Sequence, residues 1–440
     1  MRKHVVAALG LVVAGMLAPC LLHAQRLSMS DAVREAMQKN FRLTIARLDS
    51  ASASARARMG ASGLYPSVDI AANGLTGENN ISQRTASGVN IDRAGAGFTN
   101  MNANATLQWT LFDGFRMVAI DEQMSRMADA EREAARGAYA RVIADVMTRY
   151  AAVVASEHAL EGGTAALRLA ERRLELTKRR LDVGQTSQVS VAQAEIDRNA
   201  TASLVERQRT SLRIARTALS VLIARDPADS FAVDTGLAMP QLDDPAVLEA
   251  AMLERNPELL AAEQQVQAAR AEERQASASL WPRIDAVGGY GMTNNSTEAG
   301  FILENRTTGW NAGLQMRFNL FRGFADEQAQ ELARVETLRR RAEIDDLRSR
   351  MRGELASSID RYRTGERLLV LERSTLAAAR ANADVVLESY RQGLVSDLDV
   401  RQAQQSLVEI TTRMAQLEFE VYSSAIEALR LSGRLVRYAP

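Results

Sequence analysis

Two stretches of the 440-residue sequence combine a glycine with hydroxyl and carboxyl side chains at spacings that suit helix capping. The stretches VGQTSQVSVAQA and QGLVSDLDVRQA lie 209 positions apart. In each, a glycine (Gly184, Gly393) is followed three residues later by a serine (Ser187, Ser396), a pattern typical of one helix ending and the next being capped. Asp399, three residues after Ser396, is placed to be a capping carboxylate that the helix dipole favours.

Other side chains that could carry chemistry are few. Of three histidines, only His158 lies beyond residue 24, and its setting in a helical run favours a solvated imidazole over a ligand or base. The sequence contains no phosphate-binding loop, dinucleotide fingerprint, HExxH or GxSxG motif. Its 54 basic and 54 acidic residues cancel, so no overall field favours nucleic acid. The pattern indicates neither an enzyme nor a cofactor site.

Residues 1–24 have the features of a secretory signal peptide. Arg2 and Lys3 precede an apolar run, and we expect cleavage after Ala24. The alternative is a lipoprotein acylated at Cys20, the only cysteine, although Pro19 makes a poor cleavage site for that pathway. No later run approaches the ~20 apolar residues of a membrane-spanning helix. We therefore expect an exported chain that could enter a bilayer only as a closed barrel.

The sequence is duplicated. LQWTLFDGF is answered by MRFNLFRGF 209 positions later, and LYPSVDI by LWPRIDA 216 positions later. We expect a first structural repeat at 25–235 and a second at 236–440. Each repeat is expected to begin with one helix, at 30–62 or 245–279. A strand, a polar loop, a second strand and two long helices follow.

The expected strands lie at about 65–76, 100–112, 281–293 and 308–321. Apolar and polar residues alternate along them, as Val68 and Ile70 do with Ser67 and Asp69. This alternation is compatible with a half-buried sheet on a soluble core and equally with membrane strands. Four strands do not close a useful barrel, whereas three chains would supply twelve.

Long helices are expected at 116–224 and 325–432, each range divided by a glycine-containing turn. Apolar residues recur every seven positions, as at Val146, Val153 and Leu160, which predicts coiled-coil packing. At ~1.5 Å per residue, a helix over 116–181 is roughly 100 Å long. Gly114 and Gly323 precede these helices, where the chain must turn from a strand.

The signal segment, the duplicated order of elements, the LFDGF and LFRGF corners and the glycine–serine turns together resemble the TolC family of outer-membrane efflux factors. The resemblance covers essentially the whole chain after the signal. It implies a mainly α fold with a membrane β-barrel portion, in which a homotrimer forms a 12-stranded barrel continuing into a 12-helix coiled-coil periplasmic tunnel. No enzymatic activity and no cofactor are implied.

The resemblance also implies a location and partners. The protein would lie in the outer membrane of a Gram-negative bacterium, in contact with its lipid and extending into the periplasm. It would be the exit duct of a tripartite efflux or type I secretion system. A periplasmic adaptor protein and an inner-membrane RND, ABC or MFS transporter would supply its substrates.

A gate at the helix tips is implied as well. Tyr390 and Asp399 fall at the family's gating tyrosine and first ring aspartate. Val395, Gln402 and Ser190 replace the gating arginine, the second ring aspartate and an acidic partner, so the family's salt-bridge lock is altered. The tip turns expected to contact the adaptor contain Gly184, Ser187, Gly393 and Ser396, and the barrel–tunnel corners contain Gly114 and Gly323.

Two other classes of protein share some of these features. A periplasmic coiled-coil adaptor without its own pore would also have a signal peptide and a helical hairpin, but it should carry one hairpin and lipoyl-like β segments. An exported enzyme lacks candidate ligands in this sequence. Two hairpins and repeated amphipathic strands favour the duct.

Overall fold

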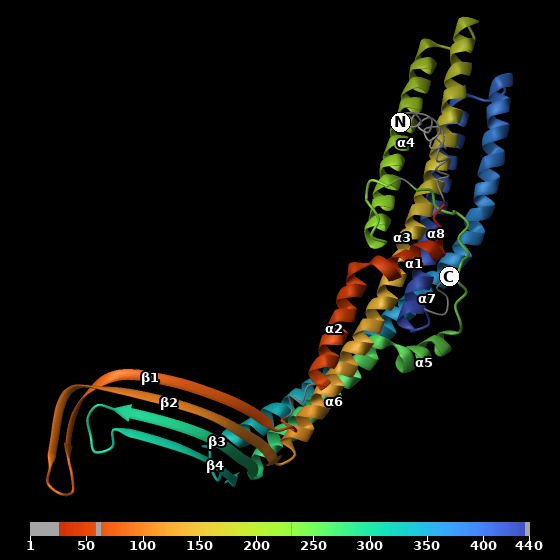
Figure 1. Cartoon of the computed structure of the whole chain (residues 1–440). Coiled ribbons are helices and arrows are strands. Elements are labelled where there is room, and N and C mark those ends of the chain that lie inside the picture. Colours follow the sequence, from red (N-terminus) through yellow and green to blue (C-terminus); the bar gives the residue numbers. More distant parts are fainter. Residues whose placement is uncertain (1–25, 59–62, 230, 436–440) are drawn as a thin grey trace, which may run out of the picture. The chain divides into compact units, whose positions relative to one another are not determined.

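The computed structural model describes residues 26–58, 63–229 and 231–435 (Figure 1). The predicted signal segment 1–24, its cleavage site and Cys20 lie outside these ranges. The chain divides into two compact units. One comprises Met1–Leu43, Tyr139–Met252 and Glu354–Pro440, and the other Thr44–Ala138 and Leu253–Gly353. Each unit therefore combines segments from both sequence repeats. Within the described ranges, no helix is both long and apolar enough to cross a membrane.

Four long helices form two hairpins (Figure 1). They are α3 (Arg116–Asp182), α4 (Gln188–Leu222), α7 (Ala325–Gln392) and α8 (Asp397–Leu431). The seven-residue pattern marks their packed faces, because Val146 and Val153 of α3 are fully buried and Val421 of α8 nearly so. Coiled-coil packing, rather than a globular core, thus fixes these helices.

The single helices expected at 30–62 and 245–279 were wrong, because each is broken in two. The first range contains α1 (Met29–Lys39) and α2 (Phe41–Arg58), and the second contains α5 (Pro245–Arg255), α6 (Pro257–Ser277) and the short 3₁₀ turn η1 (Ala278–Leu280). Asn40 and Asn256, 216 positions apart, make the breaks. Each side-chain oxygen accepts a backbone N–H at 2.8 Å two residues on, from Arg42 or Glu258, and so caps the next helix.

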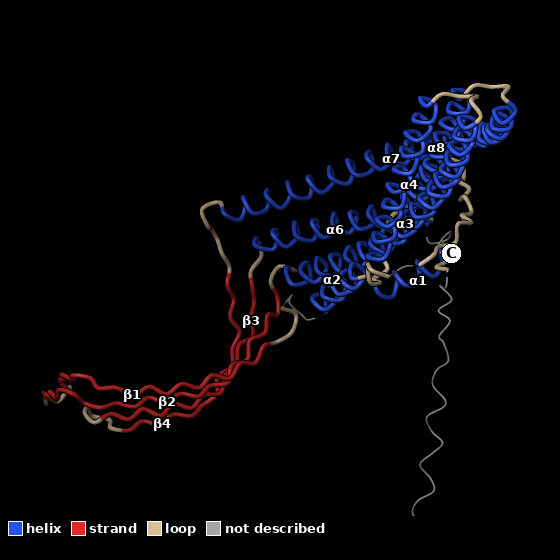
Figure 2. The backbone as a smooth tube through the Cα atoms, turned by 90° about the horizontal axis from the view of Figure 1, so that it is seen from above, coloured by secondary structure: helices blue, strands red, loops and turns tan. Residues whose placement is uncertain are grey.

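The four strands form one antiparallel sheet in the order β1-β2-β3-β4 (Figure 2). They are β1 (Ser67–Arg84), β2 (Asn90–Phe112), β3 (Arg283–Thr297) and β4 (Glu304–Arg317). The polar stretches expected to be loops are therefore largely strand, and β4 stops four residues earlier than expected. Pairing between strands satisfies the backbone N–H and C=O groups of these segments whatever their side chains are. The strand ends therefore could not be predicted from composition alone.

The strand register separates the two faces of the sheet. One row across the four strands joins Ile70, Ala105, Tyr290 and Trp310, and a row on the other face joins Asn73, Asn102, Thr293 and Thr307. The alternation expected from sequence is thus continuous from strand to strand. Residues 90–97 of β2 pair with β1 alone, so the first hairpin extends beyond the second.

Candidate functional site at the helix tips

Both long hairpins turn on a glycine with a left-handed backbone. Gly184 has φ +73° and Gly393 has φ +79°, angles that side chains with a Cβ rarely adopt. After each, a backbone N–H reaches five residues back: Gln185 N donates to Arg180 O at 2.8 Å, and Leu394 N to Ser389 O at 2.9 Å. The two turns therefore end their helices in the same way.

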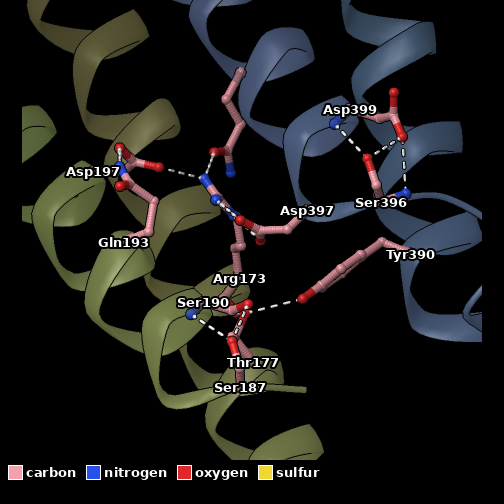
Figure 3. Close-up of polar contacts among 11 residues, drawn as sticks. Arg173, Thr177, Ser187, Ser190, Gln193, Asp197, Tyr390, Ser396, Asp397 and Asp399 are labelled. Carbon is pink, nitrogen blue, oxygen red and sulfur yellow. Dashed lines mark hydrogen bonds and ion pairs between the residues drawn. The ribbon is translucent and has the colours of Figure 1, made fainter. Parts of the chain in front are cut away.

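The serine caps differ between the hairpins. The Ser187 hydroxyl accepts from Ser190 N at 3.3 Å, and the Ser396 hydroxyl accepts from Asp399 N at 3.4 Å. Only Asp399 returns the contact, accepting from Ser396 N at 2.8 Å, which completes a capping box (Figure 3). The Ser396 hydroxyl, then its backbone N–H, lower the pKa of the Asp399 carboxyl, which is exposed and ionised. Asp399 is a capping residue in the single chain.

A buried arginine joins the two hairpins beside these turns. Arg173 of α3 is 1% exposed and lies between Asp197 of α4 and Asp397 of α8 (Figure 3). Its Nε donates to Asp397 Oδ1 at 2.8 Å, its Nη2 bonds the other oxygen of Asp397, and its Nη1 donates to Asp197 Oδ2 at 2.9 Å. Gln404 Oε1 accepts from Nη1 at 3.4 Å. These four side chains are called the Arg173 clamp below.

The charges of the Arg173 clamp depend on one another. Burial disfavours the guanidinium charge, but hydrogen bonds and attraction from Asp397 and then Asp197 more than offset it, so the pKa of Arg173 is raised. A buried ion is costly without its partners, and removing one partner leaves the other charge uncompensated. The Arg173 clamp therefore links α8 to α3 and α4, and loss of one of its charges would leave the others uncompensated.

Tyr390 makes a second connection between the hairpins. Its hydroxyl lies 3.1 Å from Thr177 Oγ1, which itself donates to the Arg173 carbonyl at 2.9 Å. The guanidinium of Arg180 lies 4.6 Å from the centre of the tyrosine ring, a cation–π distance. Tyr390 is thus 2% exposed and contacts α3 on two sides.

The other expected gate residues lie apart from these contacts. Ser190 bonds only with its own cap, Gln402 is exposed and Val395 is half-buried. Sequence reasoning missed Arg173, Asp197 and Asp397. A signal was available, because at the 209-residue spacing their counterparts are the uncharged Asn382, Ser406 and Gln188. Arg173 and Asp397, each charged in only one repeat, form a contact between the repeats.

We expected the imidazole of His158 to be solvated, but its Nδ1 lies 3.4 Å from Glu418 Oε2 of α8. The hydrogen bond to Glu418 raises the pKa of the imidazole. In the part of the chain that the structure describes, no group of three or more His, Cys, Asp or Glu side chains could hold a metal ion. The imidazole therefore acts in a helix–helix contact.

The strand-to-helix corners share one backbone conformation. Gly114 and Gly323 have φ of +69° and +62°, and the phenylalanine after each has φ +66°. A Cβ on Gly114 would stand 2.7 Å from both the Ala278 carbonyl and Trp281 Cβ, whereas one on Gly323 would meet nothing within 4 Å. The first corner is packed within the chain and the second is open.

Comparison with known proteins agrees with this architecture. Residues 32–225 and 249–434 match the family described as "Outer membrane efflux protein". The chain belongs to the outer membrane efflux protein family. One matched segment lies within residues 25–235 and the other within 236–440, and residues 226–248 lie between them.

Two relatives and one solved structure illustrate the family's range. The chain is 22% identical to the outer membrane efflux protein BepC of Brucella suis, over 79% of this chain and 76% of that protein. It is 29% identical to protein CyaE of Bordetella pertussis, over 64% of this chain and 58% of that protein. The Campylobacter jejuni CmeC outer membrane channel superimposes with a TM-score of 0.80 at 15% identity, covering 92% of this chain and 86% of CmeC.

The TolC-family resemblance is thereby confirmed, as are the outer-membrane location with a periplasmic extension and the role of an exit duct for efflux or secretion. The fold is that of TolC-type outer-membrane channels, mainly helical with one sheet. Family and fold are those of transport proteins rather than enzymes. The adaptor alternative gains no support.

Proposed function

We propose that this outer membrane efflux protein works as a homotrimer, in which twelve strands close a barrel and twelve helices form a tunnel. The observation that carries the proposal is the open sheet. β1 and β4 are both edge strands, and unpaired edges within a bilayer are costly. Pairing β4 of one copy with β1 of the next removes every edge, and three copies supply the twelve strands.

The two sheet faces support this arrangement. The face carrying Ile70, Tyr290 and Trp310 is exposed and suits lipid, and the face carrying Asn73, Asn102 and Thr307 suits a water-filled lumen. Trp109, Trp310 and Tyr290 are amphipathic aromatics of the kind enriched at membrane interfaces. The described helices need not enter the bilayer.

The duplication suggests where copies meet. Within one chain, Arg126 of α3 donates to Gln264 of α6 at 3.4 Å. The equivalent positions are Val335 of α7 and Leu48 of α2, which are 50% and 63% exposed. If adjoining copies repeat the internal junction, these two apolar side chains meet each other. Burying them would complete the ring.

A cross-linking experiment tests the trimer. Leu48→Cys with Val335→Cys should give disulfide-linked dimers and trimers but nothing larger, measured on non-reducing gels after mild oxidation. Each single-cysteine variant serves as control, because the only native cysteine, Cys20, lies in the predicted signal segment. Absence of linked species, or a ladder continuing past three, would refute the trimer.

The helix tips are proposed to form the gate of the duct. Tyr390 and the Arg173 clamp would keep the hairpins together, while Asp399 and Gln402, three copies of each, would surround the axis. Three Asp399 carboxylates at close quarters would attract cations. Val395 and Ser190, which belong to the same tips, would shape the opening without carrying charge.

The tip turns are proposed to receive the periplasmic adaptor, through which an inner-membrane RND, ABC or MFS transporter would deliver substrates. The turns that would make this contact contain Gly184, Ser187, Gly393 and Ser396. Exposed Val189 and Leu398 beside the caps provide apolar area for such a contact. Recording single-channel conductance in planar bilayers tests the duct itself. Purified protein should conduct once the tips are loosened, and a persistent lack of conductance would refute it.

A further inference from the structure

The fourth strand, β4, ends earlier than its counterpart β2. At the 209-residue spacing, residues 109–112 of β2 correspond to 318–321, yet β4 ends at Arg317. Residues 109–112 lie beyond the last pair between β2 and β1, Gln108 with Ser67, and they pair only with β3 on the other side. Among the described residues β4 has no such second neighbour, so it ends with its last partner in β3, Arg283.

The junction between β2 and β3 contains a carboxylate whose charge is compensated. Asp285 of β3 is 2% exposed and lies opposite Thr110, whose hydroxyl donates to Asp285 Oδ1 at 2.8 Å. Arg283 Nε donates to both oxygens of Asp285 at 2.9 Å, and its Nη2 donates to the Thr110 hydroxyl at 3.0 Å. The carboxylate therefore obtains its counter-charge from its own strand, two residues earlier.

The two edges of the sheet carry charges that are not compensated within the chain. At the 216-residue spacing, Asp69 of β1 corresponds to Asp285, but a serine replaces the arginine two residues earlier. Asp69 is exposed and makes no hydrogen bond or ion pair with any residue that the structure describes. On the other edge, Arg317 of β4 corresponds to the uncharged Gln108 of β2, and it is likewise exposed and unpaired among the described residues. One edge thus presents an anion and the other a cation.

The two charges meet if neighbouring copies pair β4 with β1 as β2 pairs with β3. In the β2–β3 junction, Gln108 lies opposite Val287. By the repeat spacings, Arg317 would lie opposite Ala71 of the next copy. Asp69 is two residues from Ala71 on the same face, which makes it a diagonal neighbour of Arg317. Diagonal neighbours are about 7–8 Å apart, a distance that a long side chain can span.

Arg317 also has a reason to turn away from its own chain. It lies directly opposite Arg283 of β3, and like charges placed in this way repel each other. The nearest carboxylate of the same chain is Asp285, which is buried and already accepts from Arg283 at both oxygens. A carboxylate on the outer side would therefore be the better partner for Arg317.

We propose that Arg317 of each copy forms an ion pair with Asp69 of the next copy, and that this pair fixes the register between β4 and β1 where the copies join. The inference rests on the proposed trimer, in which three such pairs would lie on the lumen face. A slip of one residue would place the arginine and the carboxylate on opposite faces of the sheet. In this register residues 318–321 continue β4 along β1 of the next copy, as 109–112 continue β2 along β3.

Exchanging the two charges tests the ion pair. Arg317→Glu and Asp69→Arg should each lower the fraction of trimer that survives mild heating in detergent about fivefold, because each places like charges beside one another. Arg317→Glu/Asp69→Arg should return that fraction to within about twofold of the unaltered protein. Asp69→Arg/Asn311→Glu is the matched control, since Asn311 lies on the same strand and face but about 20 Å from Arg317. No recovery in the exchanged variant, as for an arginine that is only solvated, or equal recovery in the control, would overturn the pair.

Cross-linking tests the register and separates it from the trimer. By the same spacings Gln315 would lie opposite Asn73 of the next copy, so Asn73→Cys/Gln315→Cys should give disulfide-linked dimers and trimers while leaving both charges in place. Asn79→Cys/Gln315→Cys, about 20 Å out of register, should give at least about fivefold less. If Leu48→Cys/Val335→Cys links copies and Asn73→Cys/Gln315→Cys does not, the trimer stands and the proposed register is overturned. If neither pair links copies, the trimer itself fails and the ion pair with it.

Discussion

The α3–α4 and α7–α8 hairpins share a backbone and differ in charge. Both turn on a glycine with a left-handed backbone, and both cap the next helix with a serine. In both, a backbone N–H after the glycine donates to a carbonyl five residues back. Yet the first hairpin provides the buried cation Arg173, and the second provides Asp397 and the capping box of Asp399.

This difference teaches what duplication preserves. A turn must satisfy its own backbone, so glycine and serine are needed in both repeats. A contact between repeats needs unlike partners, and Arg173 of the first repeat accordingly meets Asp397 of the second, while Asp197 of the first repeat adds a second carboxylate. The Arg173 clamp, the two corners, Asp399 and His158 each offer a way to test that view.

The largest effect is expected for Arg173→Met, which leaves Asp197 and Asp397 partly buried and unpaired. We expect a loss of about 3 kcal/mol in unfolding free energy, together with a larger open fraction in bilayers. Thermal unfolding by circular dichroism and single-channel recording measure these. Arg172→Met, an exposed neighbour, is the control, and Arg173→Met/Asp197→Asn/Asp397→Asn should recover most of the loss. An unaltered Arg173→Met protein would mean that the two hairpins are held by other contacts.

The corners give the next largest effect and sharpen the comparison. In the single chain only Gly114 is crowded, by Ala278 and Trp281, but in the proposed ring Tyr65 of the next copy would stand beside Gly323 as Trp281 stands beside Gly114. Gly114→Ala and Gly323→Ala should therefore each cost the assembled protein about 2 kcal/mol. Melting temperatures in detergent provide the measurement. A loss confined to Gly114→Ala would contradict the ring.

Asp399 and Ser190 occupy equivalent places in the two tips and should differ in their effect on ions. Asp399→Asn is expected to reduce cation selectivity and block by multivalent cations at least about twofold, and Ser190→Asp to increase both. Reversal potentials in asymmetric salt are the readout. Unchanged selectivity in both variants would leave Asp399 with its capping role alone.

The smallest effect is expected from pH at His158. Glu418 raises the folded pKa above the ordinary value of 6.5, so this contact stabilises fully below pH 6.5 and its contribution is lost as pH rises through the folded pKa. The melting temperature should fall by about 1–2 °C across that range, and His158→Gln should abolish the fall. Imidazole NMR titration gives the pKa directly. A pKa at or below 6.5 would contradict the stabilising contact between His158 and Glu418.

The sequence was sufficient for the long helices, because their seven-residue repeat is physical packing information that continues for many turns. Val153, Tyr362 and Val421 are buried where the pattern requires. The turns could also be predicted, because their glycines allow a left-handed backbone and their serines cap the next helix. Strand faces followed from alternation, and the register confirmed them from strand to strand.

What could not be predicted depends on contacts across the chain. Asn40 breaks a helix partly because its side chain reaches Leu222, 182 residues away. Arg173 looks like any other arginine on a helix face until Asp197 and Asp397 are seen around it. Strand ends in polar sequence depend on how far a partner continues, as β1 and β2 do beyond the end of β3.

The unequal strands have a consequence for how a cell carrying this protein meets its surroundings. Residues 90–97 of β2 have no ladder partner in β3, although Glu298 of the β3–β4 turn contacts Gly97 and Arg93, so the ribbon beyond residue 93 extends past the second hairpin. If the helix tips meet the periplasmic adaptor, as proposed, this end of the sheet faces outward. It would be the first part of the protein encountered by antibodies and bacteriophages, and one where sequence can vary without disturbing the passage behind it.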